Sequence, residues 1–195
     1  MTNGKKLILS ALLLALLQVG FLGWMIAGRA AVLRDGREVL LKVEPVDPRD
    51  LLRGDYVILS YDISRIPLSM IADLDTLGDE TSAAGEITVR LGREADGYWQ
   101  ARNAWITNPP AGAVSTDEVD IAGQIPPLNL AYAGADVRVT YGIERFYLPE
   151  GEGRAIERDM RVRPFGVRVA VPASGNAQVK ALMDGDTTLF EEPLY

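Results

Sequence analysis

The sequence predicts a mainly β protein with one N-terminal transmembrane helix followed by two similar β-rich units. Three observations lead to this prediction. Residues 7–27 form a long uncharged run that is almost entirely apolar. Much of the remaining chain alternates between apolar and polar residues in short segments, as half-buried strands do. The two halves of that remaining chain also resemble each other after a shift of 80 residues, which indicates an internal repeat.

The composition limits the chemistry that is available. The chain has 195 residues and contains neither Cys nor His, so disulfides, thiolate nucleophiles and His-based catalytic dyads are excluded. We predict no metal site and no cofactor, and we assign no catalytic residue. From Asp35 onward the chain carries 27 acidic and 16 basic residues, a formal net charge of −11. Such an acidic body is a poor match for nucleic acid, whose binding depends on neutralising phosphates.

The N-terminus is interpreted as a polar tail, residues 1–6, followed by a transmembrane helix over residues 7–27. About 20 helical residues cross the hydrocarbon core of a bilayer, and Trp24 near the distal end suits the membrane interface. A cleaved signal peptide is the alternative, because small residues around Gly28 offer a cleavage site. The apolar run is longer than a usual signal core, so we favour an uncleaved anchor.

The membrane orientation is harder to predict. Lys5 and Lys6 precede the helix, whereas Arg29, Arg34 and Arg37 follow it, so counting positive charges gives no clear answer. Two of these arginines stand beside acidic residues and are expected to belong to the folded body. We favour an N-terminus inside the cytoplasm and a body outside it.

The body is expected to follow a linker at residues 28–37. A first β-rich unit over residues 38–112 and a second over residues 113–195 would pack together as one body. Strands are predicted at residues 38–44, 56–63, 86–91 and 98–105, the last two joined by a hairpin turn at Asp96-Gly97.

The internal repeat is clearest around Tyr61 and Tyr141. A shift of 80 places residues 57–66 on 137–146, and the same shift places 87–91 on 167–171. Two such units facing each other would bury one apolar strand face from each. Similar residues occupy the pairs Val57/Val137, Leu59/Val139, Ser60/Thr140, Tyr61/Tyr141, Ile63/Ile143, Arg65/Arg145 and Ile66/Phe146.

The segment Gly54-Asp55-Tyr56-Val57-Ile58-Leu59-Ser60-Tyr61 follows a proline-punctuated loop. We expect Gly54 to make a turn, Asp55 to anchor the loop and Tyr61 to pack between the units. The segment matches the pattern Gly-Asp-Tyr-x-x-Leu-x-Tyr, and the chain therefore resembles the GDYXXLXY family of bacterial membrane-anchored proteins. Residues 45–53 and 141–153 also resemble that family.

The resemblance implies little about activity, because the family has no assigned activity. Its members often look like partner proteins of a multi-pass membrane protein. This chain has a single hydrophobic span, so the resemblance implies a separate integral membrane partner. It also implies a location at the bacterial inner membrane, and with the orientation favoured above the body would face the periplasm or the cell exterior.

Two groups of polar residues have both a functional and a structural interpretation. Asp47, Asp50 and Asp55 could perform acid–base chemistry or bind a cation, or they could cap turns and pair with neighbouring arginines. Arg65 and Arg145 could form a symmetric anion or partner clamp, or each could pair with a nearby carboxylate. The candidate binding residues are Asp47, Arg49, Asp50, Arg53, Gly54, Asp55, Tyr56, Tyr61, Arg65, Glu144, Arg145, Tyr147 and Glu150.

The sequence favours a membrane-tethered, extracytoplasmic binding or assembly module that is not an enzyme. The alternative is a carboxylate-based hydrolase of the cell envelope that uses Asp47, Asp50 or Asp55. An enzyme would bring several of these side chains together in a cleft, whereas a binding module would present an exposed patch or strand edge.

Overall fold

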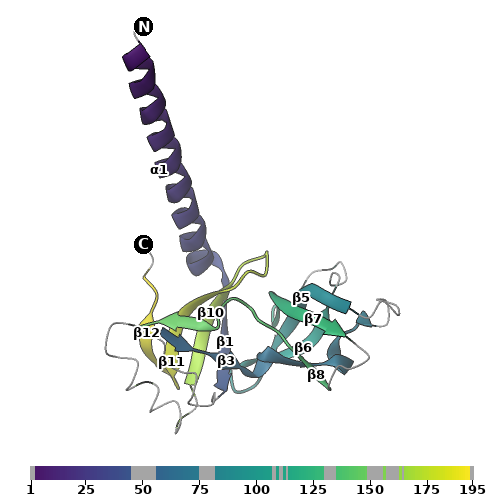
Figure 1. The fold of residues 1–195 in the computed structure, drawn as a ribbon. Coiled ribbons are helices and arrows are strands. Elements are labelled where there is room, and N and C mark those ends of the chain that lie inside the picture. Colours follow the sequence, from purple (N-terminus) through teal and green to yellow (C-terminus); the bar gives the residue numbers. More distant parts are fainter. Residues whose placement is uncertain are drawn as a thin grey trace.

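A long helix precedes a body built of β-strands (Figure 1). The predicted fold class, mainly β with one N-terminal apolar helix, is confirmed. The computed structural model describes residues 3–44, 56–74, 82–106, 109, 112, 114–129, 135–148, 156, 163 and 165–193.

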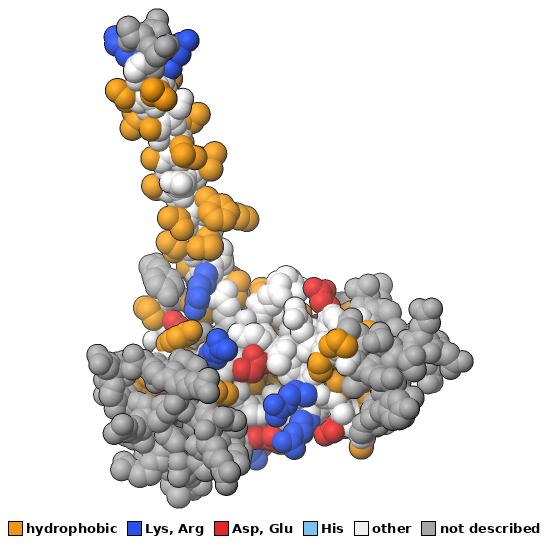
Figure 2. Space-filling view, in the orientation of Figure 1, with side chains coloured by type: hydrophobic (Ala, Val, Ile, Leu, Met, Phe, Trp, Pro, Cys, Tyr) orange, Lys and Arg blue, Asp and Glu red, His pale blue; other side chains and the backbone are white. Residues whose placement is uncertain are grey.

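The helix α1, Asn3–Asp35, contains 33 residues. Leu and Ala, which favour helical backbone, dominate it, and no proline interrupts it. Its large apolar side chains are exposed along the shaft (Figure 2). Among the described residues, α1 is the one helix long and apolar enough to cross a membrane. The helix predicted at residues 7–27 is therefore present and extends eight residues further, to Asp35.

The strands form a five-stranded sheet in the order β12-β11-β10-β1-β3 and a three-stranded sheet in the order β6-β5-β7. Two further ladders, β2-β9 and β4-β8, contain two short strands each. In chain order the strands are β1 Arg37–Glu44, β2 Tyr56–Ile58, β3 Ser60–Tyr61, β4 Arg65–Pro67, β5 Ser82–Arg93, β6 Trp99–Trp105, β7 Glu118–Asn129, β8 Asp136–Arg138, β9 Arg145–Tyr147, β10 Phe165–Val171, β11 Gln178–Asp184 and β12 Thr187–Glu191.

Most of the predicted strands are found, with one difference at the central motif. The strands expected at residues 38–44, 86–91 and 98–105 correspond to β1, β5 and β6, and Gly97 makes the turn between β5 and β6 with a φ of +88°. The single strand expected at residues 56–63 is instead divided into β2 and β3 and ends in a 3₁₀ turn at Asp62–Ser64. The Ser64 side chain accepts a hydrogen bond from the Tyr61 N–H at 3.1 Å, which stabilises the turn at the expense of a longer strand.

The last turn of α1 packs directly on the body. Leu33 is buried, with 1% of its surface exposed, and the helix end contacts β10 and β11. Gly36 alone separates α1 from β1. A Cβ atom added to Gly36 would lie 2.5 Å from the carbonyl oxygen of Val32, so this tight connection requires glycine.

Residues 28–37, expected as a linker, are therefore helical through Asp35 and become strand at Arg37. The buried last turn explains the difference, because an apolar residue there gains more from packing on the sheet than from exposure in a linker. An ion pair between Arg29 and Glu192, with an N–O distance of 3.8 Å, also joins the helix to the residue that follows β12.

Residues 56–67 and 136–147 pair with each other reciprocally. Ile58 in β2 lies opposite Arg145 in β9, and Arg138 in β8 lies opposite Arg65 in β4. Ile58 shifted forward by 80 positions is Arg138, and Arg145 shifted backward by 80 positions is Arg65. The first pair is therefore related to the second by the shift of 80. The relation holds for every pair in both ladders. We call the approximate two-fold axis between these ladders the exchange axis.

The same relation extends into the larger sheets. β10 lies between β11 and β1, and β5 lies between β6 and β7. The hairpins β5-β6 and β10-β11 have the same register when their residue numbers are shifted by 78. Arg90 pairs with Asn103 in the first hairpin, and Arg168 pairs with Ala181 in the second. Each hairpin has a bulge immediately after this arginine. For the hairpins, the predicted ungapped shift of 80 is therefore two residues too long.

The two halves exchange their first strands. β1, from the first half of the chain, pairs with β10, and β7, from the second half, pairs with β5. One contiguous cluster of buried apolar side chains includes residues from both halves, among them Leu59, Tyr61 and Ile63 and their counterparts near Tyr141. The exchange ties the halves together. The internal duplication itself stays a prediction.

Candidate functional site

Two tyrosines cross the exchange axis and bind each other's segment. The Tyr61 hydroxyl donates a hydrogen bond to the Ile143 carbonyl at 2.6 Å, and the Tyr141 hydroxyl donates one to the Ile63 carbonyl at 2.7 Å. Both tyrosines are buried, Tyr61 completely and Tyr141 with 5% exposed. Each ring therefore provides apolar area to the core while its hydroxyl satisfies a buried carbonyl.

Burial governs the protonation of these side chains. It raises the pKa of the Tyr61 hydroxyl well above its usual value, and the nearby charge of Glu144 raises it further. The pKa of Tyr141 is raised by burial first and then by the charges of Glu144 and Asp62. Both hydroxyls therefore remain protonated donors at neutral pH, as a structural role requires.

Asp62 stands in the 3₁₀ turn between β3 and β4 and is half-buried. Burial raises the pKa of its carboxyl group, although a hydrogen bond accepted from the Ile63 N–H at 2.8 Å acts in the opposite direction. The residue related to Asp62 by the shift of 80 is Gly142, which has a φ of +77°. There the side chain of Glu144 accepts the hydrogen bond from the Tyr141 N–H, as Ser64 does for Tyr61.

A groove of about 280 Å³ lies on the exchange axis. Its walls contain hydroxyl groups, the carboxylate of Glu144 and the arginines Arg138 and Arg145. Eight of its nine lining residues form pairs at the shift of 80, namely Ile58/Arg138, Leu59/Val139, Ser60/Thr140 and Ser64/Glu144. We call this feature the axial groove.

A second cavity, of about 490 Å³, opens over β7. Its lining includes Glu86, Gln124 and Asn176, and Glu144 lines both this cavity and the axial groove. The described lining contains no Lys or Arg. The two hollows therefore differ in charge: the axial groove is rich in guanidinium groups, whereas the cavity over β7 is acidic and polar.

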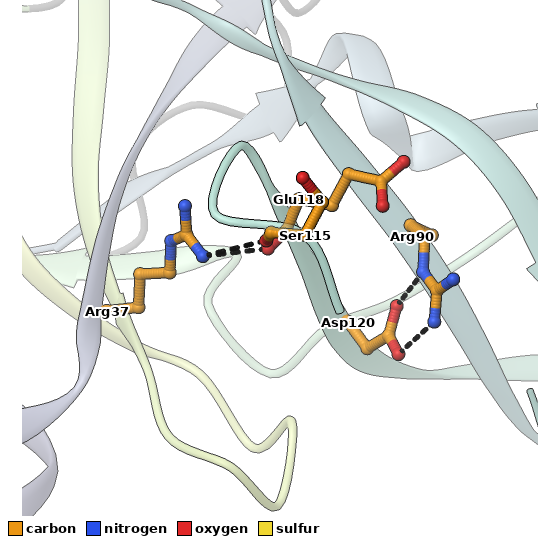
Figure 3. A network of polar contacts seen from close by, with 5 residues as sticks. All are labelled: Arg37, Arg90, Ser115, Glu118 and Asp120. Carbon is orange, nitrogen blue, oxygen red and sulfur yellow. Dashed lines mark hydrogen bonds and ion pairs between the residues drawn. The ribbon is translucent and has the colours of Figure 1, made fainter. Parts of the chain in front are cut away.

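Two arginines, Arg90 and Arg37, make polar contacts with residues of the three-stranded sheet (Figure 3). Arg90 in β5 forms a bidentate ion pair with Asp120 in β7, with N–O distances of 2.7 and 2.8 Å. Its guanidinium lies 5.1 Å from the centre of the Trp105 ring. Bidentate geometry and stacking are interactions that arginine makes and lysine does not.

Arg37, the first residue of β1, reaches across to the start of β7. Its guanidinium donates to the Glu118 carbonyl at 2.9 Å and to the Ser115 carbonyl at 3.4 Å (Figure 3). It also lies 4.9 Å from the centre of the Trp99 ring. Because Arg37 comes one residue after Gly36, these contacts attach the three-stranded sheet to the base of the helix.

The structure brings part of the predicted site together. Tyr61 and Glu144 lie at the exchange axis, Arg145 lines the axial groove, and Arg65 lies opposite Arg138. Tyr147 in β9 is 66% exposed. Tyr56 belongs to β2. The remaining predicted residues, Asp47, Arg49, Asp50, Arg53, Gly54, Asp55 and Glu150, lie outside the described residues.

Sequence reasoning missed Arg138, Arg37 and Arg90. Arg138 is matched with an isoleucine at the shift of 80, so the repeat gave it no special status. The alternative hydrolase depends on three aspartates outside the described residues, and within the described part of the chain no group of three acidic residues is placed to hold a metal ion.

The fold and site define a class of protein: a β-rich body with exchanged strands, fixed to the end of a single candidate membrane helix. The chain belongs to the GDYXXLXY protein family, whose model matches residues 18–182. The predicted family resemblance is therefore confirmed. No curated protein and no solved structure matches the chain.

Proposed function

We propose that this protein is a membrane-tethered binding or assembly module that contacts a separate multi-pass membrane protein. The observation that carries the proposal is the direct connection between α1 and the body. Leu33 is buried, the end of the helix contacts β10 and β11 of the five-stranded sheet, and Gly36 alone separates helix from strand. A body held in one orientation relative to a bilayer suits a partner that is itself fixed in that bilayer.

The distance between body and membrane supports the same proposal. Residues 28–35 continue the helix beyond the apolar run, which adds about 12 Å at ~1.5 Å per residue. The body would therefore stand close to the lipid headgroups, within reach of the extramembrane loops of a neighbouring protein. We place it outside the cytoplasm on the inner membrane of a bacterium, with Lys5 and Lys6 on the cytoplasmic side.

We also infer that the two β-rich units are an internal repeat. The registers of three kinds of strand pair support this inference, because shifts of 80 and 78 relate the two members of each kind. A binding surface on the exchange axis would then combine equivalent segments that carry different side chains.

The first prediction concerns the anchor. The protein is expected to remain in the membrane fraction after extraction at alkaline pH, because residues 7–27 of α1 are uncharged and almost entirely apolar and we expect them to stay uncleaved. Intact mass spectrometry of that fraction should find a chain that starts at Met1 or Thr2. A mature chain that starts near Ala31 would show that the segment is a signal peptide and would remove the tether.

The second prediction concerns the partner. Photo-crosslinking from Tyr147 in the body and from Trp24 in α1 should capture the same multi-pass membrane protein in native membranes. Both positions are exposed, at 66% and 74%, and p-benzoylphenylalanine is close in shape to either side chain. The same group at Glu191, on the edge strand β12, serves as a control for surface exposure.

Crosslinks between copies of this chain alone would contradict the proposal and indicate a homo-oligomer. Equal capture of many unrelated membrane proteins from all three positions would also contradict it. Mass spectrometry of the crosslinked bands distinguishes these results.

A further inference from the structure

Two arginines face each other across the β4-β8 ladder. Arg65 lies directly opposite Arg138, and both side chains are exposed. The neighbouring pair is hydrogen-bonded, since the Val139 N–H donates to the Ser64 carbonyl at 2.9 Å. Hydrogen-bonded and non-hydrogen-bonded pairs alternate in antiparallel ladders, so Arg65 and Arg138 form a non-hydrogen-bonded pair, whose side chains lie closest together.

This arrangement is unfavourable for the isolated protein. Like charges directly opposite each other destabilise a strand pair. Within the described part of the chain, no carboxylate forms an ion pair with either arginine. The related ladder β2-β9 shows that a second arginine is not needed for pairing. There Ile58, the residue related to Arg138 by the shift of 80, lies opposite Arg145.

The axial groove adjoins this arginine pair. Arg138 and Arg145 line it together with the hydroxyl groups of Ser60 and Thr140. Guanidinium groups bind carboxylates through two parallel hydrogen bonds, and hydroxyl groups can donate further ones. Glu144 lines the same groove, and its negative charge favours a singly charged carboxylate over a doubly charged phosphate.

We propose that Arg65 and Arg138 clamp a carboxylate side chain from an acidic segment of the protein partner, with the axial groove holding the residues around it. This proposal rests on the proposed function, because it names the chemistry by which the module recognises its partner. Charge complementarity selects the occupant: two exposed arginines lie directly opposite each other on a body that carries a net charge of −11 from Asp35 onward.

The test uses the full chain in detergent micelles and two synthetic peptides, one alternating Glu with Gly and the other alternating Gln with Gly. Microscale thermophoresis at fixed ionic strength measures both affinities. The wild-type chain should bind the Glu peptide at least ten-fold more tightly than the Gln peptide. Arg138→Ile, which installs the residue found at the related position, should abolish this preference.

Arg93→Ile is the matched control, because Arg93 is also an exposed strand arginine and its loss changes the net charge equally. It should retain the preference for the Glu peptide. An equal loss in both variants would show that general electrostatic attraction causes the binding and would overturn the proposal. Binding of the Glu peptide by Arg138→Ile at wild-type affinity would overturn it as well.

Thermal unfolding separates a lost site from a damaged fold. Arg138→Ile should leave the Tm unchanged or raise it by a few degrees, because it removes the repulsion between like charges. A lower Tm would assign Arg138 to the structure and overturn the proposal. Inorganic phosphate should compete poorly with the Glu peptide, and equal competition would indicate a free-anion site. The crosslinking results with Tyr147 test the membrane partner independently of this peptide binding.

Discussion

Replacing Tyr61 with alanine is expected to lower the free energy of unfolding by about 3–5 kcal/mol, the usual cost of truncating a large buried aromatic side chain. Tyr61 is fully buried, and its hydroxyl donates to the Ile143 carbonyl at 2.6 Å. The substitution therefore creates a cavity and also leaves a buried carbonyl without its donor. Since domains are commonly stable by only ~5–15 kcal/mol, this loss would be a large part of the total.

Tyr141→Ala should cost nearly as much, because its hydroxyl makes the reciprocal bond to the Ile63 carbonyl. Tyr61→Phe and Tyr141→Phe keep the rings and remove one hydrogen bond each, so each should cost about 1–2 kcal/mol. Urea unfolding of the full chain in micelles, followed by circular dichroism, measures all four variants. Alanine variants that unfold at the wild-type urea concentration would show that these tyrosines do not hold the two segments together.

Local patterns made Tyr61 and Tyr141 predictable. Alternation over residues 57–63 and 137–143 identified the apolar face of each segment, because side chains on a strand point to opposite faces in turn. The structure buries that face in both segments wherever side chains are described. The reciprocal hydrogen bonds were not predictable, since they depend on which segment lies opposite which.

The axial groove illustrates the limit of the repeat as a guide. The shift of 80 drew attention to Arg65 and Arg145 because they match each other, whereas Arg138 was overlooked because it differs from Ile58. The pairing register places Arg138 opposite Arg65, and this register is set by long-range contacts. The informative residue was thus the one that departs from the repeat.

The connection between α1 and the body was predicted as a linker for a related reason. Residues 28–37 contain charged and small residues, which are typical of a membrane-proximal linker. Leu33 and Gly36 give a local reason for the observed structure, a buried last turn followed by a tight connection. Their role becomes recognisable only when the sheet against which Leu33 packs is known.

Gly123→Val is expected to destabilise the body by about 3 kcal/mol, at the upper end of the usual cost of overpacking a core. Gly123 is buried in β7, where it pairs with Ile87. A Cβ atom added there would lie 2.5 Å from Cγ1 of Val139 and 3.1 Å from the ring of Tyr141. Valine is stiff about χ1, so the clash would have to displace the Val139 side chain, the Tyr141 ring or both.

The repeat alone would predict the opposite result, because the residue related to Gly123 by the shift of 80 is Val43. Urea unfolding of Gly123→Val therefore tests whether the packing around Tyr141 or the similarity between halves governs this position. Gly112→Val is the control: Gly112 has no atom within 4 Å of an added Cβ, and exposed substitutions usually change stability by less than about 0.5 kcal/mol. If Gly123→Val were as stable as this control, the close approach of β7 to Tyr141, and with it the tight closure around the exchange axis, would be wrong.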